Sequence, residues 1–104
     1  MGFQIGGTVL DFIVLGILRR QDEYGYILTQ EVRSILDVSE TALYPALRRL
    51  KNAGLLTAYD RPFQGRNRRY YRLTEAGRQA LSDYEAEWSI FHQKMDRLLK
   101  GDTP

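Results

Sequence analysis

The last quarter of the chain constrains the fold most, because it has the pattern of one helix that is long for so small a protein. Glu75–Lys100 lies between Thr74, which can cap its start, and Gly101, which can end it. A helix of that length measures about 39 Å. Its apolar residues alternate at spacings of three and four, the heptad pattern of helices that pack together. We expect a two-fold homodimer, although packing wholly on the chain's own first helix is the alternative. The expected interface residues are Leu81, Tyr84, Trp88, Phe91, Met95 and Leu98.

Three shorter helices are predicted before this segment. The first, Thr8–Arg20, is apolar on nearly all sides, which predicts a core helix covered by neighbours all round. The second, Tyr26–Leu36, is apolar on one side and polar on the other. The third is expected to begin near Ala42 and to end at Gly54.

Pro45 lies inside the third segment, within "TALYPALRRL". An interior proline costs a helix about 3 kcal/mol, but the first turn has no helical partners for its N–H groups. We therefore expect Pro45 in a loosened first turn, with Asp37 or Ser39 as the N-cap. Helical spacing places one group of residues inward and another outward. The inward residues are Leu43, Leu47 and Leu50, and the outward residues are Thr41, Tyr44, Pro45, Arg48 and Asn52.

The segments "LLTAYD" and "RRYYRL" are rich in apolar and aromatic residues, and "RPFQGRN" separates them. This pattern predicts a β-hairpin with a seven-residue loop. Three helices followed by a hairpin are typical of the winged helix-turn-helix. We expect a mainly α fold with a small two-stranded β-wing and a long C-terminal dimerisation helix. Residues 1–74 would form the DNA-binding domain, and residues 75–104 the dimerisation helix and tail.

Positive charge is concentrated in the middle of the chain. Between Arg48 and Arg72 there are eight basic residues and one acidic residue, a net charge of +7, whereas the remainder carries −5. This asymmetry indicates a local site for a polyanion. A solvated charged face is the alternative interpretation.

The predicted fold suggests how the chain would meet double-stranded DNA. In a winged helix-turn-helix the third helix enters the major groove, and wing arginines suit the backbone or the minor groove. Tyr44 could contact a phosphate or a thymine methyl group, and Arg48 could contact guanine. The candidate DNA-binding residues are Tyr24, Tyr26, Ser39, Thr41, Ala42, Tyr44, Pro45, Arg48, Arg49, Lys51, Asn52, Arg66, Asn67, Arg68 and Arg69.

Three segments, "YGYILTQEV" (24–32), "SETALYPALRRLKNAGLL" (39–56) and "RRYYRLTEAGR" (68–78), resemble the small subfamily of PadR-family transcriptional regulators. The resemblance implies a homodimeric bacterial repressor that leaves DNA when a ligand or stress signal arrives. It also implies a hydrophobic or aromatic effector at the tryptophan of the last helix, although pure packing remains the alternative role for Trp88. The candidate effector-binding residues are Phe12, Leu15, Trp88, Phe91 and Met95.

Several classes of function are disfavoured by composition. The chain has no cysteine and one histidine, His92, so Cys/His metal clusters cannot form. It also lacks a phosphate-binding glycine loop and a nucleophile set, so we expect neither an enzyme nor a cofactor. The longest apolar run, Val9–Leu18, contains Asp11 and is too short to span a bilayer, which predicts a cytoplasmic, nucleoid-associated protein. A winged-helix module that binds protein or RNA without reading DNA sequence is the alternative.

Overall fold

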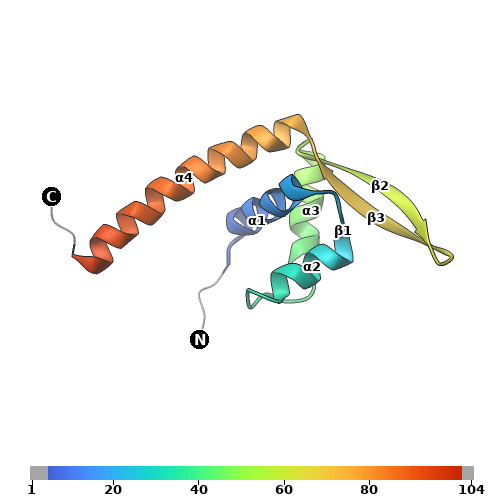
Figure 1. Cartoon of the computed structure of the whole chain (residues 1–104), viewed down its shortest axis with the longest axis horizontal. Helices are drawn as coiled ribbons and strands as arrows, with labels where there is room; N and C mark the ends of the chain where they lie inside the picture. The colour runs from blue at the N-terminus through green and yellow to red at the C-terminus, as the bar shows by residue number, and fades with distance from the viewer. Residues whose placement is uncertain (1–4, 102–104) are drawn as a thin grey trace.

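The computed structural model describes residues 5–101, in which a helical body and a small sheet are joined to one projecting helix (Figure 1). Its dimensions are 60 × 33 × 20 Å, and the projecting helix extends the long axis. The expected winged helix-turn-helix with a long C-terminal helix is confirmed. Residues 102–104 of the predicted tail lie outside the described residues. The elements are α1 (Gly7–Arg20), β1 (Glu23–Tyr24), α2 (Gly25–Arg33), α3 (Leu43–Asn52), β2 (Leu56–Phe63), β3 (Arg66–Leu73) and α4 (Glu75–Lys100).

The core lies where α1, α2 and α3 meet the base of the sheet and the start of α4. Apolar side chains from all of these elements are buried together, and each contributes about 1.5 to 3 kcal/mol to folding. The three predicted inward leucines of α3 are among them. The fully buried large side chains are Val14, Leu15, Leu18, Leu28, Thr29, Leu43, Leu47, Leu56 and Leu81.

Two expectations about the first helices were wrong. α1 is not covered all round, because Val9 is 44% exposed and Phe12, Ile13 and Ile17 are only partly buried. α2 ends at Arg33 instead of three residues later, because the chain tightens into a turn in which the Ile35 N–H donates to the Val32 carbonyl.

The start of α3 agrees with the expectation for Pro45 but not for the cap. α3 begins at Leu43, which makes Pro45 its third residue, where an N–H has no helical partner. Neither predicted capping side chain, that of Asp37 or that of Ser39, bonds to the helix start; Ala42 occupies the N-cap position. The Ser39 carbonyl instead accepts a hydrogen bond from the Ala42 N–H at 3.2 Å, and this turn leads into the helix.

The sheet is larger than predicted. Its order is β1-β3-β2, and β1 lies between the first two helices, where no strand was expected. The seven-residue loop was also wrong, because β2 and β3 pair as far as Phe63 and Arg66. Gln64 and Gly65, with φ of 52° and 77°, form the connection, and such left-handed pairs match the twist of a tight hairpin. Pro62 is tolerated because β2 is an edge strand.

The predicted ends of α4 are confirmed. The Thr74 hydroxyl accepts a hydrogen bond from the Gly77 N–H at 3.0 Å, and Gly101 ends the helix with φ of 69°. α4 first packs on α1, where Arg19 Nη1 lies 2.8 Å from Glu85 Oε2, and then runs free of the body (Figure 1).

Candidate nucleic-acid interface and effector site

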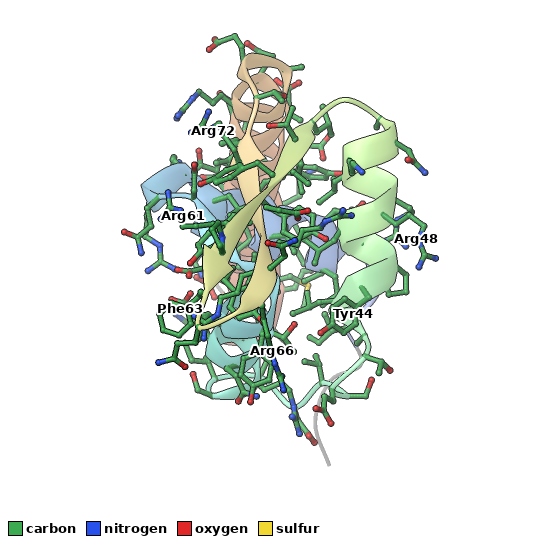
Figure 2. All side chains as sticks on the ribbon, turned by 90° about the vertical axis from the view of Figure 1, so that its right-hand side faces the viewer. Tyr44, Arg48, Arg61, Phe63, Arg66 and Arg72 are labelled. Carbon is green, nitrogen blue, oxygen red and sulfur yellow. The ribbon has the colours of Figure 1, made fainter. Side chains whose placement is uncertain are left out.

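The exposed face of α3 carries the side chains that the sequence singled out. Tyr44 is 43% exposed and Arg48 is exposed one turn further along. In Figure 2 Arg48 projects from α3 on the side away from the hairpin, whereas Tyr44 lies at the start of the helix, nearer the hairpin. Of the other candidates here, Ala42 is half-buried and the following are exposed: Ser39, Thr41, Pro45, Lys51 and Asn52.

Tyr71 of β3 is half-buried in the sheet near this face. Burial raises the pKa of Tyr71; Tyr44 adds to the increase, while Arg69 and Arg48 oppose it. Tyr71 also packs against Gly25, where an added Cβ would meet the ring at 3.2 Å. The start of α2 is thereby held against the sheet beside α3.

Arg49 has a different role from its neighbour Arg48. Its Nη2 lies 2.7 Å from Asp11 Oδ1 on α1, and the Asp11 side chain is only 16% exposed. The predicted DNA-binding residue Arg49 is therefore engaged in an ion pair that joins α3 to α1. A partly buried carboxylate with this one partner is costly to leave unpaired.

The wing divides the basic residues between its two faces, because side chains alternate along a strand. Asn67 and Arg69 lie on the face continuous with the core, and Arg69 Nε is 3.5 Å from Asp60 Oδ1. Arg66 and Arg68 lie on the opposite face, and the Arg68 guanidinium carbon lies 3.7 Å from the ring centroid of Phe63. The predicted wing arginines, Arg66, Arg68 and Arg69, therefore do not share one face of the sheet.

We call the face opposite the core the outer sheet face. It comprises two sets of residues: Arg61, Arg66, Arg68 and Arg72, and Tyr24, Tyr59, Phe63 and Tyr70. Tyr24 and Tyr26, both predicted to bind DNA, have ring centroids 6.2 Å apart, and Tyr26 is exposed beside this face.

Five of the eight residues of the outer sheet face were not among the candidate DNA-binding residues: Tyr59, Arg61, Phe63, Tyr70 and Arg72. Arg61 and Arg72 were noted only for their charge, in the basic segment between Arg48 and Arg72. The signal was present as alternation: every second residue is aromatic or arginine from Tyr59 to Phe63 and throughout "RNRRYYR". Placing Arg61 and Phe63 in a loop concealed that period of two.

An aromatic cluster marks the junction of α1 and α4. Phe12 stacks on Tyr84 at 5.7 Å and lies 6.5 Å from Trp88, which in turn lies 6.3 Å from Phe91. Trp88 is 52% exposed and Phe91 is 55% exposed. Phe12 also lines a groove of about 450 Å³ between α1 and α4.

The structure separates the remaining candidates for the effector and dimer sites. Leu15 is fully buried in the core, so it does not line an exposed surface. Met95 is half-buried and Leu98 is 79% exposed. Of the seam residues, Leu81 is in the core and Tyr84 covers α1, whereas Trp88, Phe91 and Leu98 are exposed. The seam therefore packs on the chain's own first helix only at its beginning.

None of the helices within residues 5–101 has the length and apolar character needed to span a bilayer. The same residues contain no cluster of three His, Asp or Glu side chains able to hold a metal ion.

Comparison with known proteins places this geometry among regulators. Residues 14–83 match the model of the transcriptional regulator PadR-like family. The crystal structure of smu.1704 from Streptococcus mutans superposes with a TM-score of 0.90 at 33% identity, covering 100% of this chain and 98% of the other. The negative transcriptional regulator PadR of Bacillus subtilis is 30% identical over 90% of this chain, which spans 52% of that relative's length.

A structure of Bacillus subtilis PadR in complex with operator DNA is also similar. It superposes with a TM-score of 0.67 at 26% identity, covering 76% of this chain and 48% of the other.

Proposed function

Because the chain belongs to the PadR-like family of transcriptional regulators, we propose that it is a homodimeric repressor that reads duplex DNA with α3. The observation that carries this proposal is the exposed polar face of α3, where Tyr44 and Arg48 project beside a wing that ends in Arg66. The similar Bacillus subtilis protein is a negative transcriptional regulator with a structure in complex with operator DNA, which supports repression and DNA binding.

The first test measures binding to the duplex upstream of the protein's own gene and to a scrambled duplex of equal length, over a series of salt concentrations. A sequence-specific regulator should prefer the native duplex by about a thousandfold or more, with a steep salt dependence. Equal, weak binding to both duplexes would contradict sequence reading at this site and favour the interaction-module alternative.

Arg48→Ala tests the role of α3 itself. If Arg48 contacts guanine, its removal should cost about 1 to 3 kcal/mol of binding and relax the preference at one base position. Arg78→Ala on exposed α4 is the matched control for the lost charge, and it should leave base preference unchanged. An equal loss for Arg48→Ala on every sequence would restrict this residue to phosphate contacts.

Dimerisation through α4 is the second part of the proposal. The second half of the helix exposes apolar side chains that a soluble monomer rarely displays together. Leu98 and Leu99 are 79% and 76% exposed, and Trp88 and Phe91 are each more than half exposed. A second copy of α4 related by a two-fold axis would cover this surface.

The third part is release from DNA by a flat aromatic or hydrophobic effector at Trp88. Phe12 touches this tryptophan's aromatic cluster, and Asp11, the preceding residue of α1, holds Arg49 of α3. A ligand that displaces Phe12 would therefore also move the carboxylate that positions α3. Such a ligand should quench the fluorescence of Trp88, the single tryptophan, and lower DNA affinity. Asp11→Asn should keep the quenching but weaken the effect on DNA; quenching with full release in Asp11→Asn would refute this coupling.

A further inference from the structure

The outer sheet face extends beyond Tyr24, Arg66 and Arg68, which were predicted to bind the same duplex as α3. Its other two arginines, Arg61 and Arg72, have no part in that proposed reading. Strand register brings its residues side by side: Tyr59 is opposite Tyr70, and Arg61 is opposite Arg68. Tyr24 of the short strand β1 is opposite Tyr70 on the other side of β3. Aromatic and guanidinium groups therefore alternate from the base of the hairpin to its tip.

These groups are stacked on one another. The guanidinium carbon of Arg72 lies 5.2 Å from the ring centroid of Tyr59, which stacks on Tyr70 at 5.6 Å with 15° between the planes. The Arg61 guanidinium carbon is 4.9 Å from the Tyr70 centroid. Towards the tip, that of Arg68 lies between Tyr24, at 4.8 Å, and a phenylalanine ring.

The base of this stack is fixed by one carboxylate. Asp22 Oδ2 accepts hydrogen bonds from the Tyr59 hydroxyl at 2.7 Å and from Arg72 Nε at 3.0 Å. Within residues 5–101, Asp22 is the only acidic side chain that forms an ion pair with an arginine of this face. The face therefore keeps a strong net positive charge.

The stacking decides which chemistry the face presents. A guanidinium that stacks through its flat side keeps its N–H donors pointing outward in the plane, where they suit the oxygens of a phosphate. The rings of Tyr59 and Tyr70 are already covered by each other and by arginines, so they offer little free surface on which a base could stack. Among the rings of this face, Phe63 at the tip is 44% exposed. Along the rest of the face the donors, with little free ring surface beside them, favour a phosphodiester backbone over an unpaired base.

The outer sheet face also points away from the exposed side of α3. In Figure 2, Arg48 projects to the right of α3, whereas Arg61 and Arg72 lie on the left of the hairpin. We propose that the outer sheet face binds the phosphate backbone of a second DNA duplex, so that the regulator can bridge two DNA segments. This inference rests on the proposed function, in which α3 holds the first duplex.

The test captures a second duplex. The native upstream duplex is fixed to beads, loaded with the full-length protein, washed, and exposed to a fluorescent duplex of scrambled sequence. We expect the loaded beads to retain the fluorescent duplex. The double variant Arg61→Gln with Arg72→Gln should load equally but retain about tenfold less, because two phosphate contacts per chain are lost.

A matched control is Arg78→Gln with Arg97→Gln, which removes the same charge from exposed positions of α4 and should retain full capture. Undiminished capture by the outer-face variant, at equal loading and equal thermal stability, would overturn the proposal. An equal loss of capture in both double variants would also overturn it. The same holds if single-stranded DNA or polyglutamate displaces the captured fluorescent duplex as effectively as unlabelled duplex does. Failure of the wild-type protein to load on the native duplex would instead refute the proposed function. In that case, the affinities of the two double variants for the scrambled duplex would be measured directly and compared, and this comparison would decide the role of the outer sheet face.

Discussion

Gly77→Ala is predicted to destabilise the protein, although alanine is the better helix former. Gly77 is the third residue of α4 and is buried where the helix begins. A Cβ here would overlap the carbonyl oxygen of Leu55 and lie 2.6 Å from Leu73 Cδ1. The same carbonyl accepts a hydrogen bond from the Thr74 N–H at 3.1 Å, so the helix cannot move away without weakening its own anchor.

The magnitude follows from two opposing effects. Replacing glycine by alanine in a helix gains about 1 kcal/mol. Overpacking costs about 1 to 3 kcal/mol, and the upper value applies because the overlapped atom belongs to the backbone and not to a flexible side chain. The expected net loss is about 2 kcal/mol, which for a domain of this size lowers the melting temperature by about 8 to 16 °C.

Thermal and urea unfolding followed by circular dichroism, at one fixed protein concentration, would measure this loss. Ala76→Gly at the neighbouring exposed position is the control, and it should cost about 1 kcal/mol through helix propensity alone. Propensity would predict opposite signs for the two variants, whereas the packing around Gly77 predicts the same sign. A Gly77→Ala variant as stable as the wild type, or more stable, would refute this account of the junction.

Three further predictions address other parts of the molecule. Phe91→Asp should convert the proposed dimer to a monomer in light scattering, and a wild-type dimer whose mass this variant leaves unchanged would show that α4 is not the interface. Gln64→Gly should raise the free energy of unfolding by up to about 1 kcal/mol, seen as a higher urea midpoint, because Gln64 has φ of 52°; a lower midpoint would contradict strain at this turn. Stability should be intact below pH about 10 and fall above it, because burial raises the pKa of Tyr71 and the folded chain keeps a proton that the unfolded chain loses. Tyr71→Phe should make the loss of stability above pH about 10 less steep, and an equally steep loss in that variant would show that another group causes it.

Features set by local chemistry were predictable from the sequence. The start and end of α4 followed from Thr74 and Gly101, whose roles depend only on residues a few positions away. The position of Pro45 followed from the absence of helical partners in a first turn. The inward face of α3 followed from a strong helical period.

Features set by contacts distant in sequence were not predictable. β1 is a strand only because it pairs with the edge of β3. Glu23 pairs with Tyr71, and Tyr24 pairs with Tyr70, so the partners lie some 47 residues apart in the chain. The ion pair of Arg49 with Asp11 likewise joins two helices whose arrangement no local pattern specifies. A tight hairpin turn with a glutamine at positive φ gave no standard signal, and missing it concealed the outer sheet face.

Because much of α4 extends beyond the body, a small rotation at its start would produce a large displacement at its far end in the proposed dimer. The helix is held to its own body near its start and would meet its partner beyond Tyr84, so a small tilt at the body is amplified along its length. Over about 39 Å, a rotation of about 5° displaces the far end by about 3 Å. That displacement is about the rise of one base pair, so a slight tilt of α1 against α4 would put the two recognition helices out of register with half-sites on one face of the duplex.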